Sequence, residues 1–581
     1  MPPRVKVPLT LAWREWSRLQ CAVILLLLVA GLFELIAGSA LPFAGYDTYN
    51  HLYWIGQWHK LWSMGIFYPR WLPDSYAGFG APTFYFYPPF TYVLTSALSA
   101  AMPGMTPEAI GKILALLTLV LSGFTMWLYL RWKFPDRWTN IFAALLYMFA
   151  PYRFFDYSTR GALSEHVSLV FVPLLFWGLD RIAERRDERE LQRGFALLLF
   201  GIALMLITNL PTAVVALIGI AIYALAQKGQ ARTRALAWSA SAVVLAGILC
   251  AFYLLPAYAL RGDARIGRLW TPVPIAWSSP LTAIFTGENI TINSYSLLMY
   301  LGALVLFAAL LRNQKSNRQW LGILVAVIVL QLPILSYYLF WFVPPFTIAQ
   351  LPYRLSILVL IVAAIIWQNE LRGKTGVAAS FIVATWSLAV IGLVAFQFTK
   401  FHVHPDDRLP VGDAPEYASR WEHPPPFQKH GQQAYLDFAA ALAAPFANDS
   451  QSILLPGGKQ PTRAKREIYS DTIDYTSEIS GQALLHYSYW PAWRASIDGI
   501  SAQTAPDSLG RLTIVVPEGR HRVIVWLETS TAANTGIWVS FFTFLLLTIS
   551  WIFTRRSNQS ATMRRLLRRT NLPPVDSFSS Q

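Results

Sequence analysis

An aspartate and a histidine stand four residues apart in the sequence GYDTYNHLYW, which follows a long apolar run. If this segment is helical, Asp47 and His51 lie on one face, because residues four apart are neighbours on a helix surface. A carboxylate and an imidazole in that arrangement can supply a general base or half of a metal site. The alternative is a solvated loop carboxylate beside an interfacial histidine, and the spacing fits both interpretations.

A second group of ionisable side chains lies in the sequence PYRFFDYSTRGALSEH, between two apolar runs. Its members are Arg153, Asp156, Arg160, Glu165 and His166. Charges beside a membrane are costly unless they are paired or hydrated. Arginine forks bind phosphate or pyrophosphate bidentately, so the segment is a candidate binding site for a phosphorylated substrate. The alternative is a set of salt bridges that only joins two helices.

Further ionisable residues stand near the predicted helix ends. Arg354 follows the Pro-rich sequence FWFVPPFTIAQLPY, where a lone arginine is either an interfacial anchor or a ligand. Glu34 lies inside the first apolar run, and carboxylates in such runs are usually partnered or functional. A long loop at residues 258–295 would cover the site with three more arginines, which are Arg261, Arg265 and Arg268.

The elements that must position these residues are apolar helices. Hydrophobic residues make up 55% of the 581 residues and charged residues 14%, against about 25% charged in soluble proteins. Mean hydropathy is +0.40. Runs such as CAVILLLLVAGLFELIAGSA are long enough to cross roughly 30 Å of hydrocarbon as helix. The composition therefore predicts an α-helical polytopic membrane protein and argues against a soluble multidomain enzyme.

Hydropathy predicts about twelve transmembrane helices. They lie near residues 20–39, 110–130, 138–152, 164–179, 194–209, 211–226, 236–257, 296–311, 320–337, 355–367, 377–397 and 536–554. The first is expected to be an uncleaved signal anchor, because no small-residue cleavage site follows it. The two cysteines, Cys21 and Cys250, lie inside apolar runs and are expected to be packing residues.

The distribution of basic residues predicts the orientation. More than half of the 47 lysines and arginines fall in segments that share one side of the membrane if the N-terminus is cytoplasmic. The positive-inside rule then places both termini in the cytoplasm. This distribution explains the net charge of +15 without a nucleic acid partner. The basic tail MRRLLRRT is expected to contact anionic lipid headgroups.

Two long outer segments follow from this topology. Residues 84–102 are apolar enough to span the membrane, but a span there would place the basic segment DRIAERRDERELQR on the outer side. They are therefore predicted to form an interfacial helix in an outer loop at 41–109. The second segment, 398–535, begins with a Pro-rich linker. It then alternates with period two in REIYSDTIDYTSEI, QALLHYSY, RLTIVV and HRVIVWLE, separated by PAW, DG, PDSLG and PEGR turns.

These alternating stretches predict an extracytoplasmic β-sandwich, inserted before the last transmembrane helix. Its tryptophans Trp490, Trp493 and Trp526 either bind glycan or form an aromatic core. The chain then divides into a transmembrane domain at 1–397, a linker and β-sandwich at 398–535, and a last helix with a basic cytoplasmic tail at 536–581.

The order of several short sequences is similar to that of a known family. DTYNHL, YPRWLPDSYAGFGAPTFYFYPPFTY, PYRFFDYSTRGALSEHVSLVFVPLLF, LPYRLS, YWPAWRASIDG and VPEGRHRVIVWL resemble the large bacterial membrane proteins with a 6-pyruvoyl-tetrahydropterin-synthase-related domain. Those proteins in turn resemble GT-C class membrane glycosyltransferases. The likeness covers nearly the whole chain. It does not imply pterin chemistry, because the chain supplies no soluble zinc-histidine site of that enzyme.

The resemblance implies a GT-C-like fold with a polyprenyl-phosphate sugar donor that enters from the lipid. It also implies an acidic residue just beyond the first helix, acting as catalytic base or metal ligand, and the matching position is Asp47. Tyr87, Pro88 and Pro89 would correspond to a juxtamembrane helix. Many members of the class have a second acidic residue beside the first, whereas Thr48 follows Asp47 here. A divalent metal at Asp47 and His51 therefore stays an open possibility.

The sequence thus predicts an integral glycosyltransferase of the bacterial inner (cytoplasmic) membrane. It would move a sugar from a lipid-linked donor to a glycan, lipid or protein acceptor on the outer face. Asp47 would activate the acceptor hydroxyl. The other predicted site residues would bind substrate or neutralise its phosphate, and they are His51, Arg153, Asp156, Arg160, Glu165, His166 and Arg354.

Two alternatives stay open. A transporter or flippase of lipid-linked sugars usually has ionisable groups near the midplane and an internal repeat, and neither is evident in this sequence. A non-catalytic scaffold for envelope assembly would make the β-sandwich the functional part of the chain.

Overall fold

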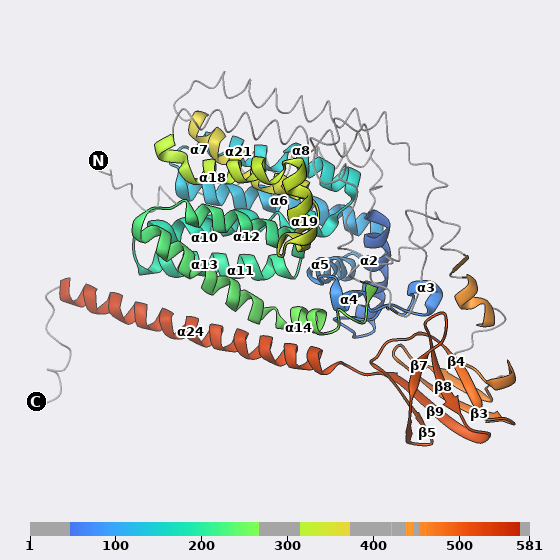
Figure 1. The fold of residues 1–581 in the computed structure, drawn as a ribbon. Coiled ribbons are helices and arrows are strands. Elements are labelled where there is room, and N and C mark those ends of the chain that lie inside the picture. Colours follow the sequence, from blue (N-terminus) through green and yellow to red (C-terminus); the bar gives the residue numbers. More distant parts are fainter. Residues whose placement is uncertain are drawn as a thin grey trace, which may run out of the picture.

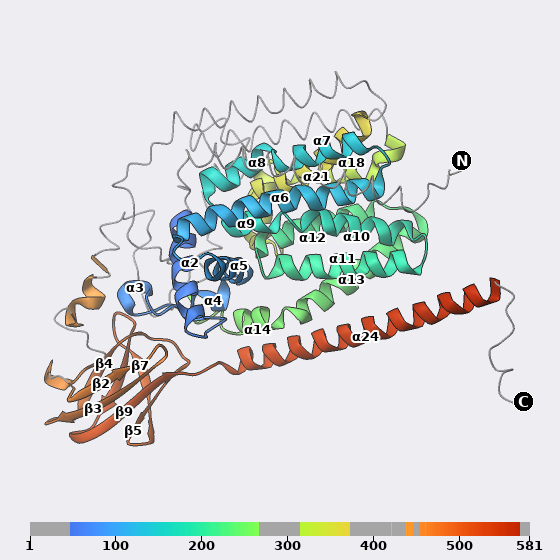
Figure 2. The same cartoon turned by 180° about the vertical axis from the view of Figure 1, so that it is seen from behind.

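A computed structural model describes residues 47–265, 314–371, 420, 437–438, 440–446, 453–458 and 461–569. Its helices α2 to α21 form an elongated bundle, and two β-sheets lie beside one end of it (Figure 1). The long helix α24 (Thr531–Arg569) starts at the sheets and runs along the bundle, as the view from behind also shows (Figure 2).

The segment that precedes the bundle, residues 47–106, is called the loop segment below. Its helices are α2 (Thr48–Ser63), α3 (Ser75–Gly78), α4 (Thr83–Phe86) and α5 (Phe90–Ala101). The bundle follows with α6 (Pro107–Lys133), α7 (Arg137–Met148), α8 (Pro151–Phe154), the π-helical turn η1 (Phe155–Arg160), α9 (Leu163–Ser168), α10 (Val172–Glu184), α11 (Glu188–Leu206), α12 (Leu210–Leu225), α13 (Gly229–Leu249), α14 (Ala251–Ala259), α18 (Gln314–Leu330), α19 (Pro333–Phe342), α20 (Phe346–Ala349), η3 (Pro352–Leu355) and α21 (Ser356–Leu371).

Three helical stretches in the described part of the chain are long and apolar enough to cross a membrane. They are Pro107–Lys133, Leu163–Glu184 and Thr531–Phe553, and they coincide with the spans predicted at 110–130, 164–179 and 536–554. Shorter apolar helices are Phe90–Ala101, Thr139–Met148, Leu210–Leu225 and Pro352–Gln368. Three predicted spans lie outside the described residues, at 20–39, 296–311 and 377–397. Glu34, in the first of them, lies outside as well. The number of twelve spans stays a prediction.

Two of the predicted spans are helix pairs bent at a short break. The span at 236–257 is α13 followed by α14 at an angle of 76°, and the span at 320–337 is α18 followed by α19 at 93°. Pro333 begins α19, and a proline removes a backbone donor from a continuing helix. Counting each pair as one span raises the number of candidate spans among the described residues to five.

The bend between α13 and α14 is held by helix α24. The hydroxyl of Ser540 accepts a hydrogen bond from the Phe252 backbone N–H at 2.9 Å. A side chain at Gly536 would come within 2.4 Å of the Ala251 carbonyl oxygen, so only glycine allows this approach. The apolar part of α24 is otherwise only 11% buried, which suits a helix that faces lipid.

The interfacial helix predicted at 84–102 is also divided. Helix α4 ends at Phe86 and α5 begins at Phe90, with Pro88 and Pro89 between them. Proline disfavours a helical conformation at the residue before it, which explains the break. Helix α6 begins cleanly after this segment, since the Thr106 hydroxyl accepts a hydrogen bond from the Ala109 N–H.

The two ends of the bundle differ in their polar side chains. At the end away from the sheets, Asp180 accepts hydrogen bonds from Tyr129 at 2.5 Å and from Tyr223, and forms an ion pair with Lys133. The Arg234 guanidinium donates to the carbonyl of Ala183 there at 2.7 Å. Helices α6 and α10 span the distance from this end to the candidate functional site described below.

The C-terminal strands form two antiparallel sheets. One has the order β1 (Ile453–Leu454), β4 (Gly481–Ser488), β8 (Arg511–Val516), β7 (Thr504–Pro506). The other has the order β2 (Arg463–Arg466), β3 (Ser470–Ser477), β9 (Gly519–Leu527), β5 (Trp493–Ile497), β6 (Ile500–Ala502). Short 3₁₀ turns, η6 (Ala444–Phe446) and η7 (Pro456–Gly458), precede most of these strands.

The two sheets bury alternate residues in one hydrophobic cluster. Ile473 of β3 pairs with Val523 of β9 in one sheet, and Ala483 of β4 pairs with Ile514 of β8 in the other. All four side chains belong to the shared cluster. The DG turn predicted after β5 is present, with positive φ at Asp498 and Gly499, as a tight hairpin requires. The alternating stretch predicted from residue 466 is interrupted, because a turn separates β2 from β3.

The sheets pack against the loop segment through buried tryptophans. Trp493 contacts Trp71 edge to face at 5.7 Å, and Trp490 lies 5.7 Å from Tyr85. Trp490 and Trp493 are fully buried, so they are core residues, whereas Trp526 is 37% exposed. The contact fixes the sheets beside the part of the chain that carries Asp47.

Candidate functional site

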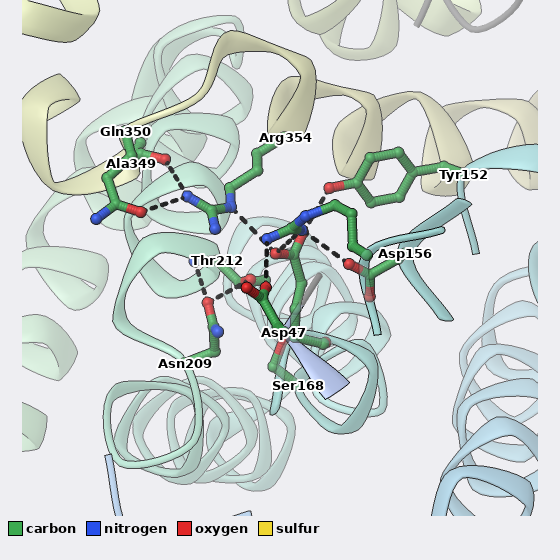
Figure 3. Close-up of polar contacts among 11 residues, drawn as sticks. Asp47, Tyr152, Asp156, Ser168, Asn209, Thr212, Ala349, Gln350 and Arg354 are labelled. Atoms are coloured by element: carbon green, nitrogen blue, oxygen red, sulfur yellow. Dashed lines mark hydrogen bonds and ion pairs between the residues drawn. The ribbon is translucent and has the colours of Figure 1, made fainter. Parts of the chain in front are cut away.

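Five of the ionisable residues singled out from the sequence meet at one end of the bundle. Asp47 precedes α2, Asp156 and Arg160 belong to η1, Glu165 lies in α9 and Arg354 in η3. Figure 3 shows Asp47, Asp156 and Arg354 converging from these separate segments. These five residues are called the Arg160 cluster below.

Arg160 stands at the centre of the cluster. Its Nη1 donates to Asp156 Oδ1 at 2.9 Å and to Glu165 Oε2 at 2.6 Å. Its Nη2 lies 3.5 Å from Asp47 Oδ2. The guanidinium also lies 5.4 Å from the centre of the Tyr353 ring. One arginine thus contacts three carboxylates, which compensates part of the cost of burying them.

Arg354 reaches the cluster from the other side of Glu165. Its Nε donates to Glu165 Oε2 at 3.0 Å, and its Nη1 donates to the carbonyl oxygen of Ala349 at 2.8 Å and to Gln350 Oε1 at 2.9 Å. Tyr152 donates a short hydrogen bond to the other oxygen of Glu165. Arg354 is therefore not a lone interfacial anchor, and its partner Glu165 is shared with Arg160.

The local backbone explains why residues 156–165 can gather in this way. Residues Phe155–Arg160 form a π-helical turn, a feature that is common at functional sites. Gly161 then adopts a φ of +66°, which other residues rarely adopt. This conformation ends the turn and lets the Arg160 carbonyl oxygen accept a hydrogen bond from the Asp47 N–H at 2.7 Å.

Asp47 differs from the other two carboxylates in its exposure. Its side chain is 45% exposed, whereas those of Asp156 and Glu165 are fully buried. The protein around Asp47 raises the pKa of its carboxyl above the usual 3.8, and Arg160 and Arg354 oppose this rise. Burial together with the neighbouring Glu165 raises the pKa of Asp156 well above its usual value. Asp47 is therefore the most exposed of the three carboxylates in the cluster.

His51 lies one turn along α2, but it faces aromatic side chains. Its Nδ1 lies 2.7 Å from the Tyr92 hydroxyl, and its ring stacks on Tyr92 and meets Trp54 and Tyr87 edge to face. Burial, with a further contribution from Arg160, lowers the pKa of His51 to about 3. The imidazole is thus neutral near pH 7 and suited to hold α2 against the rest of the loop segment.

Arg153 and His166 form a separate pair beside the cluster. Arg153 Nη2 lies 3.4 Å from His166 Nε2, and the same nitrogen of His166 lies 3.1 Å from the Ala115 carbonyl oxygen. The Arg153 guanidinium is 5.8 Å from the centre of the Tyr147 ring. Both residues are buried. Their contacts within the protein fit the interpretation of a structural link between α8, α9 and α6.

The described residues contain no group of three or more His, Cys, Asp or Glu side chains that could hold a metal ion. Within the pair considered for a half site, the Nδ1 of His51 is directed to the Tyr92 hydroxyl, and metal binding at Asp47 and His51 stays a prediction. Cys250 is buried with its thiol 3.4 Å from the Ala203 carbonyl oxygen, as expected for a packing residue. The arginines Arg261 and Arg265 are described, whereas Arg268 lies outside the described residues.

The sequence reasoning missed several participants. Tyr152 and Gln350 are hydrogen-bonding partners of Glu165 and Arg354, and Tyr353 lies under the Arg160 guanidinium. Gly161 could have been found from the sequence, because a glycine directly after a dense set of charges indicates a change of backbone conformation. All four lie within four residues of a predicted site residue, but their side-chain directions depend on the tertiary fold.

The chain resembles known proteins in structure only. No family model matches the chain, and no curated protein matches it. Two solved structures of the arabinofuranosyltransferase AftD from Mycobacteria, one of them a mutant, are similar at 15% identity with TM-scores of 0.41 and 0.40. The match covers 64% of this chain but only 28% and 26% of those chains, so this chain spans about a quarter of their length.

Proposed function

We propose that this protein is an integral membrane glycosyltransferase. It would transfer a sugar from a polyprenyl-phosphate-linked donor to a glycan, lipid or protein acceptor on the outer face of the bacterial inner membrane, with both termini in the cytoplasm. The observation that carries the proposal is the exposure of Asp47 within a cluster of otherwise buried charges. The long apolar helices supply the membrane context in which a lipid-linked donor is available.

The proposed reaction uses Asp47 as a general base. Its carboxylate accepts the proton of an acceptor hydroxyl while the acceptor oxygen forms a bond to the anomeric carbon of the sugar. The bond from that carbon to the phosphate oxygen breaks, and polyprenyl phosphate leaves with the electron pair. Arg160 keeps the carboxylate near the reacting group through its 3.5 Å contact and places positive charge where the phosphate charge develops.

The arginine part of the proposal has a structural requirement. Arg160 and Arg354 are already paired with carboxylates, so binding of a donor phosphate requires at least one of them to exchange a carboxylate contact for a phosphate oxygen. A planar guanidinium can do this bidentately, whereas an ammonium cannot. Arg153 is less suited to the same role, because it is fully buried and lies beside the Arg160 cluster rather than in it.

Substitution of Asp47 is the direct test. Asp47→Asn keeps the shape and removes the base, so the transfer rate from a synthetic polyprenyl-phosphate sugar should fall by roughly 10²- to 10⁴-fold with little change in donor binding. Asp74→Asn is a matched control. Asp74 is also in the loop segment, its side chain is 44% exposed, and it is paired with Lys60 at 2.7 Å. Transfer by this control should stay within about twofold of wild type, as is usual for a surface ion pair.

The same preparations distinguish the alternatives. A flippase would move the lipid-linked sugar across a reconstituted bilayer without forming a new glycosidic bond. Sugar transfer would then be absent from the wild-type protein and from both asparagine variants. A scaffold would tolerate Asp47→Asn in both assays. Full transfer by the purified Asp47→Asn protein would eliminate Asp47 as the catalytic base.

A further inference from the structure

Gly161 and Thr48 approach each other more closely than any side chain would permit. A Cβ built at Gly161 would lie 1.9 Å from Thr48 Oγ1, 3.0 Å from the Thr48 backbone nitrogen and 3.1 Å from Thr48 Cβ. The Gly161 backbone also has a φ of +66°. Glycine is thus required here both by its conformation and by the space that the start of α2 occupies.

This approach coincides with the contacts that place Asp47. Asp47 precedes Thr48, and its backbone N–H donates to the carbonyl oxygen of Arg160, which precedes Gly161, at 2.7 Å. The side chains of the same two residues meet at 3.5 Å. The start of α2 is therefore fixed against the end of η1 at neighbouring positions in the two segments, by a backbone hydrogen bond, an ion pair and a close packing contact.

We infer that Gly161 is a positioning residue for Asp47. Its missing side chain lets the start of α2 lie against the end of η1, and this contact sets the distance between the Asp47 carboxylate and the Arg160 guanidinium. The inference rests on the proposed function, because it gives Gly161 its role through the reaction of Asp47. Gly161 would thus be needed for activity although it has no side chain that could take part in the reaction.

The expected consequence of a side chain at this position is a loss of turnover. Gly161→Ala must move Thr48, and with it Asp47, by an amount comparable to the overlap. A displacement of about 1 Å at a reacting group can reduce the rate by about 100-fold, so we expect kcat to fall roughly 10- to 100-fold. The KM for the lipid-linked donor should change by less than about threefold, since Arg160 keeps its contacts with Asp156 and Glu165 and Arg354 keeps its contact with Glu165.

A matched glycine separates the steric effect from backbone strain. Gly104 lies in the same loop segment with a φ of +87°, and nothing lies within 4 Å of a Cβ built on it. Gly104→Ala therefore has a comparable conformational cost without the collision, and its kcat should stay within about twofold of wild type. Equal losses in Gly161→Ala and Gly104→Ala would overturn the inference.

A second substitution tests the named contact. In Gly161→Ala with Thr48→Ala, the hydroxyl oxygen at 1.9 Å is removed while the contacts at 3.0 and 3.1 Å remain. We expect this double variant to recover part of the lost kcat, as coupling between touching residues requires. No recovery, with a folded protein, would contradict the proposed contact.

The midpoint of the pH–kcat profile distinguishes a displaced Asp47 from a protein that is only less stable. Burial by the surrounding protein raises the pKa of Asp47, and Arg160 and then Arg354 lower it, with a smaller rise from Glu165. Withdrawal of Asp47 from Arg160 should shift the ascending limb of the pH–kcat profile of Gly161→Ala to higher pH. A variant that is merely less stable would lose activity with an unchanged midpoint, and that result would overturn the inference.

Failure of the proposed function can be told apart from failure of this inference. If wild-type protein transfers no sugar, the glycosyltransferase proposal fails, and the positional claim is then measured directly. A cryo-electron microscopy structure of Gly161→Ala should show the Asp47 N to Arg160 O distance well beyond the 2.7 Å of the unchanged protein. An unchanged distance would overturn the inference without any assay of transfer.

Discussion

The ionisation of Asp47 decides whether it can act as a base. Its pKa is raised above 3.8 by the surrounding protein, and only the deprotonated carboxylate accepts a proton. The rate should therefore increase with pH through a midpoint above 3.8 and then level off. His51, with a pKa of about 3, is already neutral over this range and adds no second ascending step. Initial rates of transfer between pH 4 and 8 check this prediction, and a His51→Gln variant should keep the same midpoint.

Arg160 offers a test of phosphate recognition at the residue scale. Arg160→Lys retains the positive charge but loses the fork that reaches Asp156, Glu165 and Asp47 at once. We expect donor affinity to fall at least tenfold, because two planar hydrogen bonds to phosphate are replaced by one. Titration of the purified protein with a fluorescent polyprenyl phosphate gives the affinity. Arg153→Lys serves as the comparison, and donor binding as tight as that of wild type in both variants would favour salt bridges that only join helices.

At the scale of elements, the packing of the sheets on the loop segment depends on Trp490. This side chain is fully buried between β4 and β5 and contacts Tyr85 and Phe86. Trp490→Ala should destabilise this part of the protein by about 3–5 kcal/mol through lost contacts and a cavity. Trp526→Ala, with 37% of the side chain exposed, should cost far less.

Thermal unfolding of the purified variants, followed by circular dichroism of the β-sheets, checks this difference. A lower midpoint for Trp526→Ala than for Trp490→Ala would contradict the packing described. Glycan binding that is lost only in Trp526→Ala would instead assign the exposed tryptophan to recognition.

For the whole molecule, the orientation in the membrane is the property on which the proposed function depends most. The Arg160 cluster lies near the N-terminal end of α10, whereas the basic connection follows its C-terminal end, so the length of α10 separates them. A reporter fused after residue 105 should therefore report the outer side, and one after residue 187 the cytoplasmic side. Reversed signals would place the cluster in the cytoplasm, where an extracytoplasmic acceptor is absent.

The sequence by itself determined which segments are apolar and which residues are ionisable beside them. A charge costs so much in hydrocarbon that hydropathy limits where helices cross, and α6 and α24 accordingly begin close to the predicted positions. Period-two alternation likewise located β4, β8 and β9, because one face of each strand is buried. Both signals are local in the chain and need no knowledge of tertiary contacts.

Only the tertiary structure decided how those residues combine. Asp47, Arg160 and Arg354 are separated by more than a hundred residues at each step, and spacing cannot predict that Glu165 lies between both arginines. Spacing placed Asp47 and His51 one helical turn apart, but it could not show that the Nδ1 of His51 contacts Tyr92, which is 41 residues further along the chain. The role of Gly161 depends on its lack of a side chain at the point where the start of α2 packs against it. A contact between distant segments is set by the packing of the whole bundle, and for that reason no local pattern in the sequence contains it.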